Sequence, residues 1–304
     1  MHTVSVLTAT YNRADLLPEL FQSLLAQEDQ AFTWVIIDDG STDGTETLIP
    51  GFQKRASFPI AYHKKTNGGK HTALNAAYPY IDSPLTIIVD SDDTLTPDAI
   101  SAIKAVYEEY KEDTDLCGFS FLRGTRDGGY LSASGVPRDG MKESFVECRL
   151  NRHIGGDMAE VWYTRCLREY PFPEFPGEKF LGEDLVWIQM AEKYQMRFFN
   201  RVIYISGYLD GGLTKNRRKH NIASPRGCVA RAEAFLNSNA DYRAKLKAGL
   251  QYYIYGRFAG MSWRELYARA HNKCLYLVLC LPAHMLYLRW RAVYSVGGTT
   301  SWTA

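Results

Sequence analysis

Short apolar runs alternate with longer amphipathic stretches through the first 122 residues of the chain. The short runs are rich in β-branched residues, which is typical of strands, and the stretches between them repeat apolar residues at helical spacing. Strands that alternate with helices form mostly parallel sheets covered by helices on both faces, so the pattern predicts an α/β fold. The predicted strands are residues 4–10, 34–38, 60–63, 86–90 and 117–122, and the predicted helices are residues 16–27, 45–52, 72–77 and 97–110.

The rest of the chain has a less regular pattern. Residues 123–156 are rich in Gly, Arg and Ser and predict loops, with one short helix near residues 141–150. We predict strands at residues 159–163 and 196–205, a helix that begins near Glu183 between them, and mostly helix over residues 223–291. The expected organisation is therefore an α/β domain over residues 1–210, with halves 1–122 and 123–210, followed by a helical region over residues 211–304.

Charge differs strongly between these two parts. Residues 1–210 contain 31 acidic and 20 basic residues, whereas residues 211–304 contain 3 acidic and 15 basic residues, which implies an anionic partner. The basic region includes an apolar segment, residues 274–288, that is shorter than the roughly 20 residues a spanning helix needs. We predict that this segment lies on an anionic membrane surface, and a buried core helix is the alternative.

The overall composition, 46% hydrophobic and 23% charged, is that of a folded globular protein. The six cysteines include no C-x-x-C pair and no histidine at metal-ligand spacing, so we expect reduced thiols. The first residues lack the basic and apolar pattern of a secretory leader. These features predict a cytoplasmic protein.

Acidic residues follow two of the predicted strands. Asp38 and Asp39 end the second strand, and Asp90, Asp92 and Asp93 follow or end the fourth. Neighbouring carboxylates repel each other unless a cation neutralises them, and oxygen ligands suit Mg²⁺ or Mn²⁺. A metal held by one or two carboxylates takes further oxygens from phosphate, which indicates a metal-bound nucleotide diphosphate. The alternative is a solvated loop whose carboxylates cap the next helix.

Neither a P-loop nor a Gly-x-Gly-x-x-Gly turn after the first strand is present, which disfavours P-loop hydrolases and dinucleotide oxidoreductases. The first turn contains Tyr11, whose ring is interpreted either as stacking on a base or as merely packing against the fold. Four further segments occur in order: VSVLTATYNR at residues 4–13, IIDDGSTD at 36–43, NGGK through to an asparagine at 67–75, and VDSDD at 89–93. In order and spacing they resemble the GT-A fold glycosyltransferases of family 2. The resemblance implies a GT-A Rossmann-like domain and metal-dependent, inverting transfer from a UDP-sugar to a glycan hydroxyl.

The resemblance also implies roles for individual residues. Thr10 and Tyr11 contact the uridine, Asp39 reads the uracil edge, Asp92 orients the donor and Asp93 binds the metal. Both Asp90-x-Asp92 and Asp92-Asp93 fit the metal motif, so the division of roles among these carboxylates stays open. The nucleotide-sugar site is expected to include Thr10, Tyr11, Arg13, Asp39, Asn67, Gly68, Lys70, Asn75, Asp90, Asp92, Arg217 and Arg218, and the metal site Asp92, Asp93 and His220.

The acceptor side is expected at Glu183-Asp184, which resembles the family's Glu-Asp element at the start of a helix. A hydroxyl that attacks the anomeric carbon must lose its proton, and we assign Asp184 as the base, with Glu183 beside it. Carboxylates that only favour the helix N-terminus are the alternative. The basic segment 215–220 is predicted to be a mobile loop that pairs with the leaving diphosphate, and a solvated turn or a lipid contact is its alternative.

The expected acceptor is a glycan, linked to a polyprenyl diphosphate, in bacterial surface polysaccharide synthesis at the inner face of the cell membrane. The aromatic residues 170–175, with Trp162 and Trp187, are interpreted either as a platform for acceptor sugars or as core. A catalytically inactive nucleotide-sugar or glycan binding module is the rival function. Nucleic acid is disfavoured because the α/β half is acidic. The sequence makes no prediction about oligomeric state.

Overall fold

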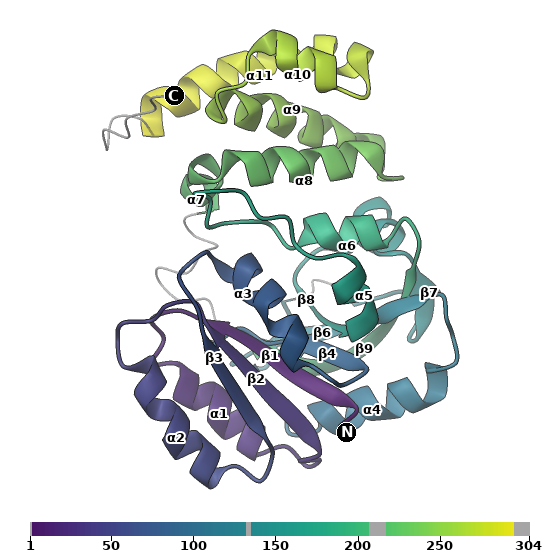
Figure 1. Cartoon of the computed structure of the whole chain (residues 1–304). Helices are drawn as coiled ribbons and strands as arrows, with labels where there is room; N and C mark the ends of the chain where they lie inside the picture. The colour runs from purple at the N-terminus through teal and green to yellow at the C-terminus, as the bar shows by residue number, and fades with distance from the viewer. Residues whose placement is uncertain (1, 132–134, 207–216, 295–304) are drawn as a thin grey trace. The chain divides into compact units, whose positions relative to one another are not determined.

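The chain folds into a mixed α/β structure followed by a helical region, as the computed structural model in Figure 1 shows. The structure describes residues 2–131, 135–206 and 217–294. The strands are β1 (Val4–Thr10), β2 (Phe32–Asp38), β3 (Ile60–Lys64), β4 (Leu85–Ile88), β5 (Thr94–Leu95), β6 (Leu116–Thr125), β7 (Met141–Glu143), β8 (Met158–Tyr163) and β9 (Gln195–Ser206). The α-helices are α1 (Leu17–Leu25), α2 (Thr45–Arg55), α3 (Lys70–Ala77), α4 (Ala99–Tyr110), α5 (Thr164–Glu169), α6 (Asp184–Met190), α7 (Arg217–Ala223), α8 (Pro225–Asn237), α9 (Tyr242–Phe258), α10 (Trp263–Arg269) and α11 (Lys273–Tyr294), with a 3-10 turn at Tyr78–Tyr80 and a π-helix at Val146–Asn151.

The chain divides into two compact units. The first unit comprises Met1–Glu174 and Val186–Leu209, and the second comprises Phe175–Leu185 and Asp210–Ala304. The expected boundary near residue 210 thus misses the short segment 175–185. That segment packs with the helical unit because the Glu178 carboxylate accepts hydrogen bonds from the backbone N–H groups of Arg226 and Gly227 at the start of α8, both at 2.8 Å.

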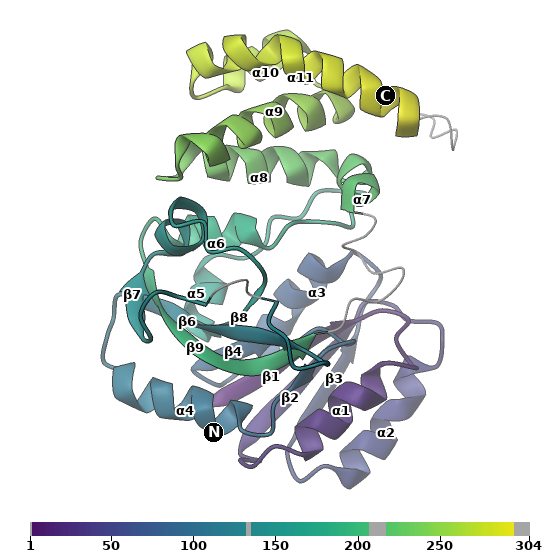
Figure 2. The ribbon, with the colours of Figure 1, turned by 180° about the vertical axis from the view of Figure 1, so that it is seen from behind.

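The nine strands that the structure describes form one sheet in the order β3-β2-β1-β4-β8-β6-β9-β5, and β7 also pairs with β9. The strands from β3 to β4 are parallel, β8 runs antiparallel to both of its neighbours, and β6 is again parallel to β9. Figures 1 and 2 show α3 on one face of the sheet and α1 and α4 on the other. The alternation of strands and helices therefore predicted the parallel part correctly and missed the reversal at β8.

Burial on both faces explains why the central strands are nearly continuous apolar runs. Trp34 in β2 is fully buried, stacks on Phe21 of α1 at 6.0 Å between ring centroids, and donates its indole N–H to Thr8 in β1 at 3.0 Å. Phe21 also stacks on Phe52 of α2 at 4.2 Å. Where β6 pairs with β8, a Cβ at Gly118 would lie 2.2 Å from the Val161 carbonyl oxygen, so only glycine fits.

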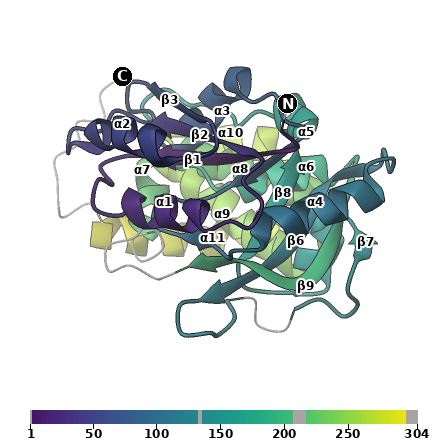
Figure 3. The same cartoon turned by 90° about the horizontal axis from the view of Figure 1, so that it is seen from below.

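Two elements differ from the predicted pattern in the middle of the chain. The predicted helix near residues 141–150 is wrong at its start, where Met141–Glu143 forms β7 and pairs antiparallel with β9. The strand β6 also continues to Thr125, beyond the expected end at residue 122. Figure 3 shows β6 and β9 running side by side, with β7 at the outer edge of β9. Both differences arise from pairing with β9, which lies far along the sequence.

The helical unit has its own apolar core among α8, α9, α10 and α11. A Cβ at Gly256 in α9 would lie 2.3 Å from a methyl carbon of Leu266 in α10, so these two helices approach too closely for a larger residue. The predicted apolar segment 274–288 lies within α11, whose Tyr276, Ala283 and Tyr287 are buried in this core. Among the described residues, no helix combines the length and the apolar character needed to cross a membrane.

Candidate active site

The turns that follow β1 and β2 are joined by hydrogen bonds into one rim. Asn12, which adopts a left-handed backbone conformation (φ 51°), donates its N–H to Ser41 Oγ at 2.9 Å and accepts the Thr42 N–H on its side-chain oxygen at 2.8 Å. Asparagine tolerates this conformation better than most residues. The locked rim leaves the Tyr11 ring 49% exposed, so Tyr11 is a surface aromatic rather than part of the core.

The last residue of β1, Thr10, carries an uncompensated polar group. Its side chain is buried, and among the described residues its hydroxyl has no hydrogen-bond partner. A buried hydroxyl without a partner costs about 1–3 kcal/mol. Thr10 is therefore a position at the carboxyl end of the sheet where the protein leaves hydrogen-bonding capacity unused.

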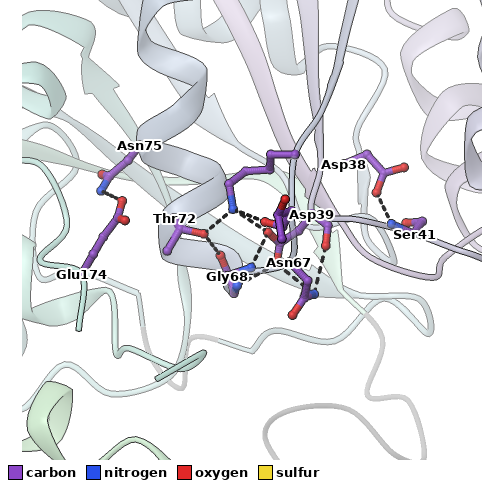
Figure 4. Close-up of polar contacts among 11 residues, drawn as sticks. Asp38, Asp39, Ser41, Asn67, Gly68, Thr72, Asn75 and Glu174 are labelled. Carbon is purple, nitrogen blue, oxygen red and sulfur yellow. Dashed lines mark hydrogen bonds and ion pairs between the residues drawn. The ribbon is translucent and has the colours of Figure 1, made fainter. Parts of the chain in front are cut away.

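Asp39, directly after β2, is the centre of a dense network (Figure 4). One carboxylate oxygen accepts from Lys65 Nζ at 2.8 Å and from the Gly68 N–H at 2.9 Å. The other accepts from the Gly69 N–H at 2.7 Å and from the Asn67 side chain at 3.2 Å. A carboxylate offers about four acceptor positions, and all four are filled by protein donors. Contact between Asp39 and a base therefore requires one of these donors to be exchanged.

Local backbone chemistry brings the segment 65–69 against Asp39. Gly40 has a φ of +86°, and a Cβ there would lie 3.1 Å from the Asn67 nitrogen, so the close approach needs glycine. Lys65 also donates to Thr72 Oγ1 in α3 at 2.8 Å. Lys65 is a site residue that the sequence did not reveal, because only the folded chain shows which of the neighbouring lysines faces Asp39.

The carboxylates after β4 are each accompanied by a basic side chain. Lys70 forms an ion pair with Asp90, and a guanidinium nitrogen of Arg13 lies 4.0 Å from a carboxylate oxygen of Asp92. Burial opposes ionisation of Asp90, but the charges of Lys70 and Arg123 outweigh it and hold the pKa of this carboxyl below its usual value. The fold thus brings Arg13, Lys70, Asp90 and Asp92 together, as the sequence predicted.

Asp93 is the most enclosed of these acids. Its Oδ2 accepts from Tyr204 Oη at 2.9 Å and from Ser206 Oγ at 3.1 Å, and an Arg123 nitrogen lies 3.8 Å away. Burial, followed by the charge of Asp90, raises the pKa of Asp93 to about 6. Arg123, Tyr204 and Ser206 were not predicted as site residues, although a cation inside the apolar strand β6 was a visible signal.

Asn75 is hydrogen-bonded to the proline-rich loop. Its side-chain oxygen accepts the Phe172 N–H at 2.9 Å, and its nitrogen donates to the Phe172 carbonyl at 2.8 Å and to the Glu174 carboxylate at 2.8 Å (Figure 4). Both ends of the amide are therefore engaged by the protein. That Asn75 lines the donor stays a prediction, and a donor contact would replace one of these hydrogen bonds.

For three of the aromatic residues considered as an acceptor platform, the structure favours the core alternative. Trp162 and Trp187 stack at 4.0 Å between centroids, Phe172 meets Trp187 edge-on at 5.7 Å, and all three are buried. These rings belong to the core of the first unit and are unavailable to acceptor sugars.

Asp184, in the second unit, is bound by arginine. Both of its carboxylate oxygens accept hydrogen bonds from the Arg231 guanidinium of α8, which also lies 4.6 Å over the Phe235 ring. Burial opposes ionisation of Asp184, but Arg231 and then Arg217 outweigh it and lower its pKa. Glu183 beside it is half-buried. Arg231 was not anticipated from the sequence, where it lies 47 positions away.

The basic segment 215–220 is helical where the structure describes it, which corrects the predicted loop. Residues 210–216, including Lys215, lie outside the described residues, and α7 begins at Arg217, which is exposed. The Arg218 guanidinium lies 4.6 Å over the Trp290 ring, and the His220 ring stacks on Phe180 at 5.7 Å between centroids. Over residues 2–131, 135–206 and 217–294, no three His, Cys, Asp or Glu side chains group into a metal site.

Comparisons with known proteins agree with this geometry. The sequence model of glycosyl transferase family 2 matches residues 5–153. An uncharacterised glycosyltransferase of Nostoc sp. is 31% identical over 252 residues, which are 82% of this chain and 72% of the relative. The poly(ribitol-phosphate) β-N-acetylglucosaminyltransferase TarS of Staphylococcus aureus is 26% identical over 196 residues, 63% of this chain. The chain spans only 32% of TarS, and less than half of several other relatives.

Two solved structures share the fold. TarS residues 1–349 in complex with UDP-GlcNAc superpose with a TM-score of 0.62 at 16% identity, covering 95% of this chain and 81% of that one. The mannosyltransferase PcManGT of Pyrobaculum calidifontis, in complex with GDP-Man and Mn²⁺, superposes with a TM-score of 0.56 at 19% identity, covering 96% and 83%. The GT-A architecture is thereby confirmed, and the chain belongs to glycosyl transferase family 2.

Proposed function

We propose that the chain transfers a sugar from a UDP-sugar to a hydroxyl group of a glycan acceptor, with inversion at the anomeric carbon. The observation that carries this proposal is the run Asp90–Asp93, which gathers three carboxylates at one sheet edge; burial of Asp93, and then the charge of Asp90, raises the pKa of Asp93 to about 6. Such a concentration of negative charge suits a divalent cation with a bound diphosphate. One structural neighbour holds UDP-GlcNAc and the other GDP-Man, so together they support a nucleotide-diphosphate sugar as donor, and the uridine base remains part of our proposal.

The nucleoside is proposed to lie at the rim formed by the turns after β1 and β2. Tyr11 offers an exposed ring for stacking, and Thr10 has an unused hydroxyl nearby in the chain. Asp39 holds the segment 65–69 through four hydrogen bonds, and its role is to shape this wall of the site. A direct contact between Asp39 and uracil, which remains our prediction, would replace the longest of these bonds, that from Asn67 at 3.2 Å.

The residues present fit a divalent metal. The donors are carboxylate oxygens, which Mg²⁺ and Mn²⁺ prefer, and their mutual repulsion is relieved by a cation. Asp92 and Asp93 would hold the ion, with its other positions filled by diphosphate oxygens. When bound, the ion supplies Lewis acidity that stabilises the leaving diphosphate. His220, whose ring stacks on Phe180, stays a prediction as a further ligand.

Basic side chains in the first unit are proposed to bind the donor diphosphate. Lys70 pairs with Asp90, and Arg13 lies near Asp92. When a phosphate group enters, it replaces the carboxylate as the anionic partner of each cation, so neither cation is left buried without a counter-charge. Arg217 is exposed and has the charge for the same task, and its place in the reaction stays a prediction. Arg218 is partly committed to the ring of Trp290.

Proton transfer is assigned to Asp184. The acceptor oxygen forms a bond to the anomeric carbon while its proton passes to a carboxylate oxygen of Asp184. The bond between that carbon and the β-phosphate oxygen breaks, and its electron pair leaves with UDP. A base must be ionised to work, and Arg231 ensures this by lowering the pKa of Asp184. The same ion pair weakens Asp184 as a base, so we expect the hydrogen bonds between Arg231 and Asp184 to lengthen or break when acceptor binds.

The proposed acceptor and the proposed cellular location are inferred from the relatives. TarS acts on poly(ribitol-phosphate) by its name, and we propose a glycan acceptor of bacterial surface polysaccharide synthesis, linked to a polyprenyl diphosphate. The enzyme is then expected in the cytoplasm, at the inner face of the membrane where such lipids are glycosylated.

The test is a panel of UDP-sugars with Mn²⁺, scored by UDP release, for the wild type and Asp184→Asn. We expect Asp184→Asn to lower turnover by about two to four orders of magnitude, the usual worth of a general base, while the affinity for UDP changes less than about twofold. Glu112→Gln, an exposed acid in the first unit, is the control and should retain full turnover. Undiminished turnover in Asp184→Asn refutes the base. UDP-sugar binding by the wild type without any transfer or hydrolysis favours a binding module instead.

A further inference from the structure

One face of α11 is an uninterrupted apolar surface. Six of its large apolar side chains are 49–71% exposed although they belong to a well-formed helix, and all but Val293 form one group of five. Their spacing of one, three or four residues places them on a single side, together with exposed Cys274 and Ala292. We call this face the α11 stripe; it consists of Leu277, Val278, Leu281, Met285 and Leu288.

The opposite face of the same helix fixes the stripe in place. Tyr276, Ala283 and Tyr287 are buried against α9 and its neighbours, and Tyr276 Oη donates to the Trp263 carbonyl at 2.9 Å. The helix cannot turn to bury the stripe without losing these contacts. The exposed apolar side chains are therefore a permanent surface of the helical unit, and large exposed apolar patches of this kind mark binding surfaces.

The charges around the stripe are all positive. Arg289 and Arg291 are exposed, and at 3.6 residues per turn they fall on the two opposite borders of the stripe. Helix α11 contains no acidic residue, and residues 217–294 together contain 14 basic and 3 acidic residues. An apolar strip bordered by arginines in a basic region matches the cross-section of a lipid monolayer that carries anionic headgroups above its acyl chains.

We infer that α11 binds in the plane of an anionic membrane, with the stripe inserted among the acyl chains and Arg289 and Arg291 at the headgroup phosphates. Trp290 and Tyr287 lie on the protein side of the helix and take no part in insertion. A second copy of the chain suits the stripe less well. A parallel pair of stripes would place arginines against arginines, and an antiparallel pair would place them opposite the helix end that carries Lys273, so in neither arrangement does an acid of α11 neutralise them.

The test uses the full chain and vesicles of phosphatidylcholine with or without phosphatidylglycerol, separated by flotation. We expect the wild type to float with the anionic vesicles, and to lose binding at high salt because screening weakens the arginine contacts. Leu281→Gln/Met285→Gln should bind about tenfold less tightly or worse, since two inserted side chains no longer gain from burial. Its matched control is Tyr242→Gln/Leu246→Gln, two exposed side chains of α9, which should bind as the wild type does.

A second pair of variants tests the charges. Arg289→Gln/Arg291→Gln should weaken binding about 25-fold, from about fivefold for each arginine at the surface, whereas Arg243→Gln/Lys247→Gln on α9 should leave it nearly unchanged. Equal losses in both pairs would assign binding to net charge and overturn the inference, as would failure of the wild type to float. A dimer in light scattering that Leu281→Gln/Met285→Gln abolishes, with flotation unchanged, would assign the stripe to a second copy. None of these readouts depends on transferase activity.

Discussion

The carboxyl edge of the sheet and the α11 surface use charge in opposite ways. At the sheet edge, each acid predicted to act on the donor already has a basic neighbour within the fold: Lys65 for Asp39, Lys70 for Asp90, Arg13 for Asp92 and Arg123 for Asp93. On α11 the arginines stand beside apolar side chains in a helix with no acid at all. Matched charges fix side chains in position before a ligand arrives. Charges whose own helix has no opposite charge, and which stand beside apolar surface, are suited to bind a partner molecule.

The comparison has an energetic consequence. Removing one partner of an enclosed ion pair leaves the other charge uncompensated, so changing one of these residues destabilises the free protein. Exposed charges contribute little to stability, so changing them affects only the bound state. Substitutions in the two regions should therefore separate cleanly into effects on unfolding and effects on binding.

The largest effect is expected at Asp93, whose negative charge is not fully compensated by its neighbours. Its pKa is raised from 3.8 to about 6, so the protonated acid is favoured in the folded state. Such a group stabilises the fold below pH 3.8, and that contribution is lost as pH rises through about 6. Asp93→Asn mimics the protonated acid, and should raise the free energy of unfolding by up to about 3 kcal/mol at pH 8 and by little at pH 3.5. Turnover should fall by about three orders of magnitude, because the proposed metal ligand is lost.

Urea unfolding at the two pH values and UDP release with Mn²⁺ measure these changes. Asp115→Asn, at an exposed carboxyl whose side chain is 75% accessible, is the control and should alter stability by less than about 0.5 kcal/mol at either pH. Loss of stability in Asp93→Asn at pH 8 would mean that the Asp93 carboxylate is fully matched by Arg123, Tyr204 and Ser206, and that a cation is not needed there.

The second effect concerns the Asp184–Arg231 pair. Arg231→Gln removes the charge that lowers the pKa of Asp184, so this pKa should rise and the acid limb of the kcat/KM profile should move to higher pH. The variant should also lose about 3 kcal/mol of stability, because an enclosed carboxylate remains without its partner. Arg226→Gln, at an exposed position of the same helix, is the matched control. A loss of stability with an unmoved acid limb would give the pair a purely structural role.

The sequence predicted the strands well because buried parallel strands are apolar on both faces, and this pattern is local. It failed where an element owes its form to a distant partner. Met141–Glu143 becomes a strand only because β9 offers its edge, and Thr94–Leu95 pairs with the far end of the same strand. The first residues of α7 were predicted to be a loop because the basic segment 215–220 follows glycines at positions 211 and 212.

The candidate site was predictable as far as it consists of strand-end residues. Asp39, Asp90, Asp92 and Asp93 follow directly after apolar runs, so their place at one sheet edge could be inferred from the order of strands. Their partners could not, since Tyr204 lies 111 positions beyond Asp93 and Arg231 lies 47 beyond Asp184. Asn75 shows the reverse case, because a residue inside a recognisable motif has its side chain committed to a loop about 100 positions away.

The smallest effect on stability is expected for substitutions in α11, and this measurement decides whether the two regions use charge differently. Arg289→Gln/Arg291→Gln should change the free energy of unfolding in urea by less than about 0.5 kcal/mol, because both side chains are exposed and their helix contains no acid. The same double variant is the one expected to lose vesicle binding, so stability and binding would be uncoupled at α11 and coupled at Asp184–Arg231. A destabilisation of about 2 kcal/mol or more would show that these arginines already have partners within the fold. The contrast between matched and unmatched charge would then disappear, and with it the reason to expect an anionic surface opposite the α11 stripe.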